Sequence, residues 1–542
     1  MKNVLEYLER SARLYPDKTA FEDLNQKITY AQLEKRAKAI GSAWAENHAP
    51  RSPIAVYMEK SVDTIALLFG IAYAGCFYVM MDLRHPKARI DHILATLEGH
   101  TVISVHSYDK QLERLELKEQ TVYLEELEGD IDEAKLQQIR SRHLDIDPLY
   151  GIFTSGSTGQ PKGVLVCHRS VIDFIDVFTE TFSISPNEVI GNQAPWDFDV
   201  SVKDIYSTIC SGATMQIIPK QYFSMPTKLL DFLCEREVTT LIWAVSALCI
   251  ISTLKGFDYR IPSALQKVMF SGEAMPMKQL RIWHETLPEA TFVNLYGPTE
   301  ITCNCTYHVV TDEDYQKDAL PIGVPFRNER ILLLDENDAL IEAANQKGEI
   351  CVSGTAVALG YCNNPQQTNK AFVQNPANHL WQEIIYRTGD VGYYDEQRLL
   401  CFTGRRDFQI KHMGHRIELS DIECAMTKIE GVQRCCCLYE NETIIACYLG
   451  SKERRELIRE LKKELPSFMI PGRFLALEQF PLTKNGKIDR NALKQQLEVE
   501  QMQRLETKLL PEDADYASIT GLRLEAAEKL GKVRPRSIGQ AN

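Results

Sequence analysis

The stretch that indicates the fold most clearly spans residues 150–170 and reads YGIFTSGSTGQPKGVLVCHRS. Two apolar, strand-like runs flank small and hydroxyl residues, which leave backbone N–H groups free to approach phosphate oxygens. The hydroxyl groups add donors and Lys162 adds a positive charge. This is not a Walker A loop, because GxxxxGK[ST] is unmatched and Pro161 precedes the lysine. We predict a phosphate-binding loop, in preference to a flexible Ser/Gly surface loop, made by Thr154, Ser155, Gly156, Ser157, Thr158 and Lys162.

An α/β alternation extends to both sides of this loop. Apolar runs such as SPIAVYM (52–58) and TTLIWAV (239–245) alternate with helical patterns, which is typical of a largely parallel sheet. Beyond about Leu320 the pattern changes to short strands joined by turns, and after Arg406 it becomes a small α+β pattern. We therefore expect an α/β protein with a large N-terminal core of α/β subdomains, a β-rich subdomain and a small α+β C-terminal domain.

The composition excludes several classes of protein. The 542 residues exceed one ordinary domain, and the net charge of -13 argues against nucleic acid as the main partner. The 15 cysteines show no paired CxxC pattern and the N-terminus has no secretory signal, which predicts a cytoplasmic location. The uncharged run 65–81 is expected to form a buried helix, a turn and a strand, with no membrane span.

Further motifs follow the loop in a fixed order. They are NLYGPTEIT (294–302), GEICVSGTAVALGYCNNP (348–365), YRTGDVG (386–392), FTGRRDFQIKHMGHRIELSDIE (402–423) and PLTKNGKIDR (481–490). Together with TSGSTGQPKG (154–163), the series resembles the adenylate-forming superfamily. That superfamily includes acyl-CoA synthetases, luciferases and the amino-acid adenylation domains of nonribosomal peptide synthesis. The resemblance covers almost the whole chain to about residue 497.

The resemblance implies ATP and Mg²⁺ as cofactors. A substrate carboxylate attacks the α-phosphate of ATP and expels pyrophosphate, and catalysis of such transfers is mostly positioning and charge neutralisation. Glu300 is expected to bind Mg²⁺, which one or two carboxylates ordinarily hold. Lys487 is expected to bridge the carboxylate and the α-phosphate as a mobile point charge. The remaining nucleotide contacts are expected from Asn294 and Tyr296 at adenine, Asp390 at the ribose hydroxyls, Arg405 at ribose or phosphates, and Thr299.

The same resemblance implies a two-state enzyme. Asp407 matches the hinge aspartate, about which a small domain would present Lys487 for adenylation and then the HMGHRIEL strand for thioester formation. Gly414 would line the pantetheine tunnel. We accordingly divide the chain into residues 1–406, residues 407–497 and a tail, 498–542. The tail resembles a fragment of the C-terminal helical domain of a tRNA uridine-modifying flavoprotein, and we assign it no function.

Asp199 separates the possible substrates. The stretch FDVSVKD (198–204) resembles the segment of amino-acid-activating members in which the aspartate binds the substrate ammonium. A buried carboxylate needs a partner, and such an ammonium supplies one. The alternative role of Asp199 is an N-cap for the following helix. The alternative functions are an acyl-CoA or aryl-acid ligase and, less favoured, a nucleotide-binding module without catalysis.

The side-chain pocket, also by resemblance, favours a small amino acid. Its bulky members leave little volume, which suggests alanine, serine or cysteine, while Lys203 keeps aspartate or glutamate as the second choice. Lys203 could pair with Asp199, pair with an acidic substrate or extend outward to solvent. A separate carrier protein bearing phosphopantetheine is the expected acceptor, as in stand-alone D-alanine–carrier protein ligases. The expected pocket residues are Asp199, Val200, Lys203, Ile242, Met269, Ser271, Gly272, Leu295, Cys303 and Asn304.

Overall fold

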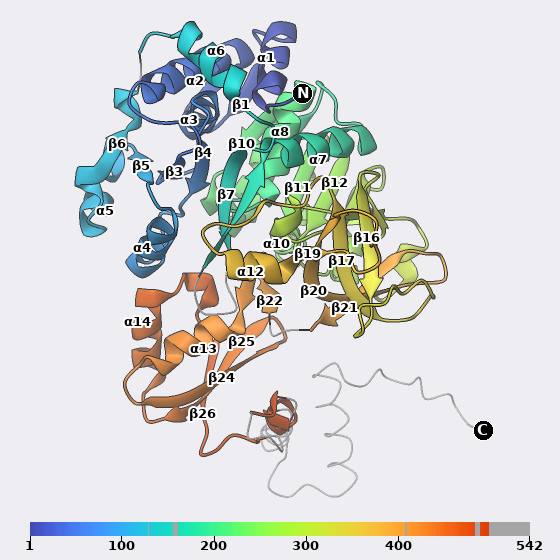
Figure 1. Ribbon diagram of the computed structural model, residues 1–542. Coiled ribbons are helices and arrows are strands. Elements are labelled where there is room, and N and C mark those ends of the chain that lie inside the picture. The colour runs from blue at the N-terminus through green and yellow to red at the C-terminus, as the bar shows by residue number, and fades with distance from the viewer. Residues whose placement is uncertain (128, 155–160, 407–408, 483–487, 491, 498–542) are drawn as a thin grey trace, which may run out of the picture. The chain divides into compact units, whose positions relative to one another are not determined.

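The computed structural model describes residues 1–127, 129–154, 161–406, 409–482, 488–490 and 492–497 (Figure 1). The chain divides into two compact units. The larger comprises Met1–Asp421 and Lys462–Met469, and the smaller comprises Ile422–Leu461 and the described residues from Ile470 onward. Within the described ranges, no helix is long and apolar enough to cross a membrane.

The first sheet of the larger unit carries the glycine-rich segment. It has seven strands in the order β18-β8-β7-β4-β3-β5-β6. Its parallel centre and the antiparallel β7–β8 pair confirm the predicted α/β class. The strands are β3 (Pro53–Val56), β4 (Phe77–Met80), β5 (Thr101–Ser104), β6 (Thr121–Tyr123), β7 (Pro148–Thr154), β8 (Lys162–Cys167) and β18 (Gly360–Tyr361).

The second sheet has nine strands in the order β15-β14-β13-β12-β11-β9-β10-β1-β2. From β1 to β13 the pairing is parallel, so the carboxyl ends of β11, β12 and β13 lie at one edge. The strands are β1 (Thr19–Glu22), β2 (Lys27–Thr29), β9 (Val189–Asn192), β10 (Thr214–Ile217), β11 (Thr240–Ala244), β12 (Lys267–Ser271), β13 (Thr291–Tyr296), β14 (Thr306–Val309) and β15 (Val324–Pro325).

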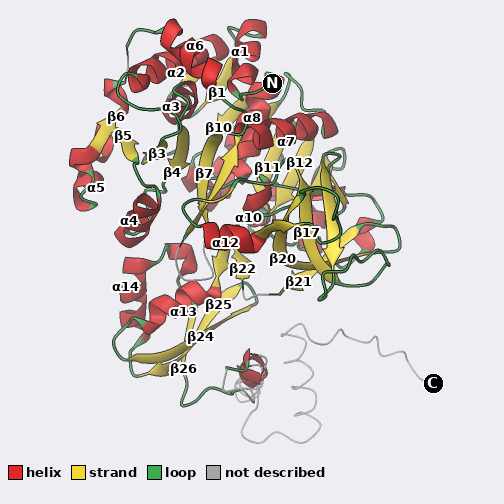
Figure 2. Ribbon diagram, in the orientation of Figure 1, coloured by secondary structure: helices red, strands yellow, loops and turns green. Residues whose placement is uncertain are grey.

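Helices cover these sheets, as the red ribbons of Figure 2 show. Helix α3 (Val62–Tyr73) is buried along nearly its whole length, and Gly75 turns the chain with a φ of 70° into β4. The prediction of a helix, a turn and a strand for the uncharged run is therefore confirmed. The other helices of the larger unit are α1 (Leu5–Leu14), α2 (Tyr30–Ala45), α4 (Lys87–Thr96), α5 (Asp109–Arg114), α6 (Glu133–Arg142), α7 (His168–Thr181), α8 (Val200–Ser211), α9 (Pro226–Glu235), α10 (Val245–Thr253), α11 (Met277–Thr286) and α12 (Pro365–Ala371).

Close packing of α2 and α3 explains one pair of glycines. A Cβ atom at Gly41 would lie 2.6 Å from the Cβ of Tyr73, and one at Gly70 would lie 2.5 Å from Cγ2 of Ile40. Contacts this short do not occur between real side chains, so glycine is needed where the two helices cross. This crossing anchors α3, which leads through Gly75 into β4, against α2.

The predicted β-rich region forms a five-stranded sheet, followed by a hairpin. The sheet runs in the order β16-β17-β20-β19, and β21 pairs with β20. These strands are β16 (Glu329–Leu334), β17 (Gly348–Gly354), β19 (Phe372–Gln374), β20 (Ile384–Tyr394) and β21 (Leu400–Arg405). The 409–418 hairpin consists of β22 (Gln409–His412) and β23 (His415–Glu418), and it groups with the larger unit. The predicted domain boundary at residue 407, which precedes this hairpin, stays a prediction.

The C-terminal part of the described chain has the expected small α+β pattern. A three-stranded sheet runs in the order β24-β25-β26, and its apolar face packs around Cys436, Ile445, Cys447 and Leu493. The elements are α13 (Leu419–Thr427), β24 (Val432–Glu440), β25 (Thr443–Gly450), α14 (Arg454–Glu464) and β26 (Arg473–Ala476).

Candidate active site

The stem of the predicted phosphate loop is a pair of antiparallel strands. Thr154 ends β7 and Lys162 begins β8, and the two are register partners. Ser155, Gly156, Ser157 and Thr158 lie outside the described residues. The ammonium of Lys162 turns inward, donating to the hydroxyl of Tyr361 at 3.0 Å and lying 3.4 Å from Oε1 of Glu300. Burial lowers the pKa of Lys162, although the charge of Glu300 opposes that shift.

Glu300 is the centre of a compact charged cluster. It lies in a single turn of 3₁₀ helix, Thr299–Ile301, and is fully buried. Its Oε1 accepts from the Tyr361 hydroxyl at 2.8 Å, and its Oε2 accepts from Nη1 of Arg416 at 2.7 Å. Burial alone would raise the pKa of Glu300, but Arg416 and Lys162 outweigh it and hold that pKa well below its usual range. We call Glu300, Lys162, Tyr361 and Arg416 the Glu300 cluster.

Glu300 is the residue predicted to bind Mg²⁺, and its surroundings can be compared with what that ion requires. The described residues contain no group of three or more histidine, cysteine, aspartate or glutamate side chains that could hold a metal. A single carboxylate still fits Mg²⁺, which commonly binds one or two carboxylates together with phosphates and water. In the present arrangement, however, Oε2 of Glu300 is engaged by a guanidinium.

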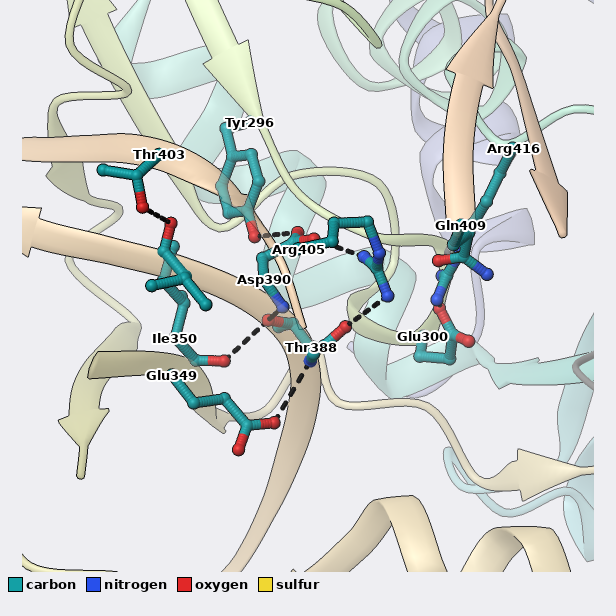
Figure 3. Close-up of polar contacts among 12 residues, drawn as sticks. Tyr296, Glu300, Glu349, Ile350, Thr388, Asp390, Thr403, Arg405, Gln409 and Arg416 are labelled. Atoms are coloured by element: carbon teal, nitrogen blue, oxygen red, sulfur yellow. Dashed lines mark hydrogen bonds and ion pairs between the residues drawn. The ribbon is translucent and has the colours of Figure 1, made fainter. Parts of the chain in front are cut away.

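Asp390 and Tyr296, predicted to hold ribose and adenine, lie in direct contact (Figure 3). The Tyr296 hydroxyl donates to one carboxylate oxygen of Asp390, and Arg405 pairs with the other. A carboxylate has about four acceptor positions, so these bonds leave room for ribose hydroxyls. The structure thus brings the three predicted residues together, and their nucleotide roles stay predictions.

The backbone around Asp390 is held by a second layer of bonds, also visible in Figure 3. The amide of Asp390 donates to Oγ1 of Thr388 at 2.9 Å, and that hydroxyl donates to the carbonyl of Ile350 at 2.7 Å. The amide of Gly389 donates to Glu349 at 3.1 Å, and Gly389 has a φ of 72°. The RTGD sequence therefore forms a fixed kink in β20, which points the Asp390 carboxylate at Tyr296.

Asn294 lies on β13 two residues before Tyr296 and is buried. Its amide nitrogen donates to the carbonyl of Pro321 at 2.9 Å. This orientation presents the side-chain oxygen as the acceptor that an adenine amino group requires. The predicted adenine contact is therefore chemically consistent with the geometry and is otherwise untested.

Asp199 stands at the N-terminus of α8 but does not cap it. It is the last residue before the helix, and its side chain makes no capping hydrogen bond, so the alternative N-cap role is wrong. Burial raises the pKa of Asp199, and a hydrogen bond from Thr299 and the nearby charges of Lys203 and Lys411 only partly offset that effect. The structure therefore leaves this carboxylate short of positive charge.

Lys203, one turn into α8, is fully buried and donates to Oδ1 of Asn304 at 2.5 Å. The possibility that it extends to solvent is therefore wrong. Burial lowers the pKa of Lys203, while Cys303, Asp199 and Asp204 act in the opposite direction. We call Asp199, Thr299, Lys203 and Asn304 the Asp199 cluster.

The turn that delivers Cys303 and Asn304 is strained. Thr302 and Cys303 have φ values of 53° and 87°, in the left-handed region that β-branched residues in particular avoid. The Thr302 hydroxyl anchors the turn on the carbonyl of Ala356 at 2.7 Å, and the Cys303 thiol donates to the carbonyl of Asp199 at 3.0 Å. Strain of this kind persists where surrounding contacts fix it, and it is frequent at functional sites.

The other predicted pocket residues come mainly from three neighbouring strands of the second sheet. Ile242 lies on β11, Met269 and Ser271 on β12, and Leu295 on β13. These four and Val200 are buried. Gly272 has a φ of 97°, and a Cβ built there would meet no atom within 4 Å. The sequence thus identified a set that converges in space, although its role as a pocket stays a prediction.

The 409–418 hairpin contributes Arg416 and Lys411, which the sequence analysis left without a role, and Gly414, whose predicted place in the pantetheine tunnel stays a prediction. Arg416 enters the Glu300 cluster, and Nζ of Lys411 lies over the Tyr296 ring, 5.6 Å from its centroid. The amide of Gly414, which has a φ of 79°, donates to Glu273 at 3.0 Å. Tyr361 lies in the GYCNNP stretch and Arg416 in the HMGHRIEL stretch. These motifs could have marked both residues as functional, but they do not indicate that both bind Glu300.

Two further predicted residues cannot be placed, in addition to the four of the phosphate loop. Lys487 and Asp407 both lie outside the described residues. Arg490, in the same motif as Lys487, pairs with Glu423 at 2.6 Å, and both belong to the smaller unit. The described part of that motif is thus anchored to α13, while the roles of Lys487 and Asp407 stay predictions.

Comparison with known proteins identifies relatives along most of the chain. The family described as "AMP-binding enzyme" matches residues 8–362. The D-alanine--D-alanyl carrier protein ligase of Bacillus cytotoxicus is 33% identical over 521 residues, covering 90% of this chain and 98% of that protein. Tyrocidine synthase 1 of Brevibacillus parabrevis is 29% identical, covering 91% of this chain and 45% of that much longer protein. A separate family, described as "tRNA modifying enzyme MnmG/GidA C-terminal helical bundle", matches residues 498–542, the tail for which the sequence shows a similar resemblance.

Solved structures have the same fold. The Vibrio cholerae adenylation domain AlmE, in complex with glycyl-adenosine-5'-phosphate, has a TM-score of 0.80 at 21% identity and covers 92% of this chain and 98% of that chain. An NRPS protein containing adenylation and PCP domains has a TM-score of 0.76 at 26% identity, covering 92% of this chain and 97% of that chain. With its phosphate-loop stem, its Glu300 cluster and these relatives, the chain belongs to the AMP-binding enzyme family and is an ATP-dependent, AMP-forming ligase of the adenylate-forming superfamily.

Proposed function

We propose that this ligase activates a small amino acid as an aminoacyl adenylate and transfers it to the phosphopantetheine thiol of a separate carrier protein. The observation that carries the proposal is the buried Asp199 carboxylate. Burial raises the pKa of this group, and its neighbours only partly offset that rise. A substrate ammonium would supply the missing positive charge. A fatty or aryl acid has no group that could do so.

The Asp199 cluster also supports a small side chain. The ammonium of Lys203 is bonded to Asn304 at 2.5 Å, so the protein already supplies it with a partner. Ile242, Met269 and Leu295 are buried and bulky. An alanine, serine or cysteine fits such surroundings, and the relatives named D-alanine--D-alanyl carrier protein ligase support the same class. A carboxylate side chain that separates Lys203 from Asn304 is the second candidate.

Magnesium and the carrier belong to the same proposal. Glu300 would hold Mg²⁺ together with phosphate oxygens, and the ion would neutralise charge on the transferred phosphates. The D-alanyl carrier ligases and the solved adenylation–PCP protein support a carrier protein as acceptor. The cytoplasm is the compartment we propose, and the free state of all fifteen cysteines supports it.

Lys487 is proposed as the charge that bridges substrate carboxylate and α-phosphate. If so, Lys487→Ala should abolish most adenylate formation while transfer from a supplied aminoacyl adenylate survives. Loss of one such donor costs about 3–4 kcal/mol, or roughly 10²–10³ in rate. Equal loss in both half-reactions would contradict this division of labour.

Amino-acid-dependent exchange of pyrophosphate into ATP tests the function directly. The panel contains both enantiomers of alanine, then serine, cysteine, aspartate, glutamate, phenylalanine and tryptophan. Propionate serves as alanine without its amine, and octanoate and benzoate represent the acyl and aryl classes. Exchange with a small amino acid but not with propionate supports the proposal. Exchange with octanoate or benzoate would assign the chain to the acyl or aryl ligases instead.

A further inference from the structure

Both oxygens of Glu300 are bound by groups that come from different parts of the chain. Tyr361 and Lys162 face Oε1, and Arg416 binds Oε2 at 2.7 Å. Glu300 is fully buried and the Arg416 side chain is 11% exposed, so water screens this pair little. Two protein cations therefore already surround one carboxylate.

Arg416 reaches Glu300 only because the 409–418 hairpin is seated. The guanidinium Nε of Arg416 donates to Gln409 at 2.6 Å, which fixes its direction across the hairpin. Lys411 stands directly opposite Arg416 in the strand register, and like charges in that relation are unfavourable. The arrangement is stable because each cation faces an anion of the site, Arg416 at Glu300 and Lys411 near Asp390.

The tip of the hairpin also makes two contacts with residues other than Glu300. The Gly414 amide donates to Glu273 at 3.0 Å. The His415 ring stacks on Phe468 with a centroid distance of 3.7 Å and an interplanar angle of 2°. A metal ion at Glu300 would not compete for these two contacts. Of the contacts described, the Arg416–Glu300 pair is therefore the one that such an ion would affect directly.

We propose that Arg416 and a divalent cation compete for Oε2 of Glu300, so that the hairpin seats fully only when the metal has left. The inference rests on the proposed role of Glu300 toward magnesium. A metal ion at Oε2 of Glu300 would need the position that Nη1 of Arg416 occupies at 2.7 Å, and it would add two positive charges beside that guanidinium. Binding of the metal and seating of the hairpin are then negatively coupled, and the coupling is reciprocal.

Hydrogen exchange followed by mass spectrometry measures the seating of the hairpin. The full chain is compared with a non-hydrolysable ATP analogue plus EDTA and with the same analogue plus MgCl₂, without any amino acid. We expect amides of residues 409–418 to exchange about tenfold faster with MgCl₂, a coupling of ~1.4 kcal/mol. A peptide from the distant strand β1 serves as the internal reference. Equal protection of the hairpin in the two conditions would overturn the proposal.

Substitution of Arg416 tests the reciprocal effect. In R416Q the hairpin should exchange rapidly even in EDTA, and MgCl₂ should change it little. Binding of Mn²⁺, followed by electron paramagnetic resonance with the same analogue, should become about tenfold tighter, again ~1.4 kcal/mol. R416K should keep the metal-dependent protection, because it retains the charge. R387Q, which removes an arginine from the different carboxylate of Glu349, is the matched control and should bind Mn²⁺ as the parent does.

The outcomes separate this inference from the proposed function. Unchanged Mn²⁺ affinity in R416Q together with a normal R387Q control would sink the competition. If R416Q does not fold, the comparison of EDTA with MgCl₂ on the parent chain still decides the question. Neither measurement includes an amino acid. If the hairpin responds to the metal but the enzyme shows no amino-acid-dependent exchange, the proposed substrate is wrong and the competition at Glu300 still holds.

Discussion

Glu300 and Asp199 are buried carboxylates of the same unit, with exposed fractions of 0% and 7%, yet their pKa values move in opposite directions. At Glu300, burial is outweighed by Arg416 and Lys162, and the pKa falls well below its usual range. At Asp199, burial wins over Thr299, Lys203 and Lys411, and the pKa rises. Similar burial thus has opposite results, because Arg416 and Lys162 lie 2.7 Å and 3.4 Å from the oxygens of Glu300, whereas the ammonium of Lys203 is bonded to Asn304.

The difference separates charge that the protein balances from charge that a ligand is expected to balance. Glu300 holds three chain segments together through Lys162, Tyr361 and Arg416, so its charge stabilises the fold even without substrate. Asp199 has a hydrogen bond from Thr299, and its lysine neighbour Lys203 is bonded to Asn304. We infer that Glu300 is first a structural charge and Asp199 first a binding charge.

The largest effect should come from removing the structural charge. Glu300→Gln leaves Arg416 and Lys162 buried without their carboxylate, which typically costs about 3–5 kcal/mol. Urea denaturation measures this as a fall in the free energy of unfolding. Glu180→Gln, at an exposed pair with Arg327, is the control and should change stability by less than about 1 kcal/mol. If the two variants lose the same free energy of unfolding, Glu300 is not a structural charge in the sense proposed here.

Removing the binding charge should affect activity more than stability. Asp199→Ala should lower kcat/KM for the amino acid more than about 100-fold, the equivalent of ~3 kcal/mol for an unpaired buried ammonium. Nucleotide affinity and urea stability should change much less. Asp204→Asn, on the same helix, is the control, because burial already raises the pKa of Asp204 to about 7. Unchanged amino-acid affinity in Asp199→Ala would favour an acyl or aryl substrate.

The pH dependence should distinguish the clusters without any mutation. The raised pKa of Asp199 means that acid protonates it early, so amino-acid affinity should weaken by up to about tenfold per pH unit below that pKa. In stability terms the neutral form of Asp199 favours the folded state, a contribution present at low pH and lost as pH rises through the raised pKa. Glu300, with its lowered pKa, contributes the opposite way: its stabilisation is present above the ordinary glutamate range and is lost only in stronger acid.

The measurement is KM for the amino acid against pH, with the nucleotide Kd recorded alongside. Acid should raise KM while nucleotide binding stays nearly constant over the same range. In Asp199→Asn the acid limb of the amino-acid profile should disappear. A profile that is the same in parent and variant would assign the titration to another group.

Local sequence predicted those parts of the fold and site that short-range patterns determine. The β7 and β8 runs and the α3 helix with its turn at Gly75 appear where their patterns indicate, whereas the HMGHRIEL stretch, expected as one strand, turns at Gly414 between β22 and β23. Arg416 and Tyr361 also lie within recognisable stretches. Their partner Glu300 is 116 and 61 residues away along the chain, however, and no periodicity encodes a contact of that kind. Lys203 shows the same limit, since only the folded turn at Thr302 and Cys303 brings Asn304 to its ammonium.

The smallest expected effect is also the one that decides the substrate. Lys203→Met removes the ammonium that donates to Asn304 while keeping a long apolar side chain in a fully buried position. If the substrate is alanine, serine or cysteine, the pair only forms the pocket wall, and kcat/KM should change by no more than about tenfold, or ~1.4 kcal/mol. If the substrate is aspartate or glutamate, its carboxylate takes the place of Asn304 at Lys203, and the variant should lose that activity selectively. Lys60→Met, at a half-buried lysine bonded instead to the carbonyls of Asn192 and Gln193, controls for loss of a lysine charge alone. A parent enzyme that prefers phenylalanine or tryptophan would contradict both substrates, because Met269, Leu295 and Ile242 would then have to leave the space that their burial indicates they fill.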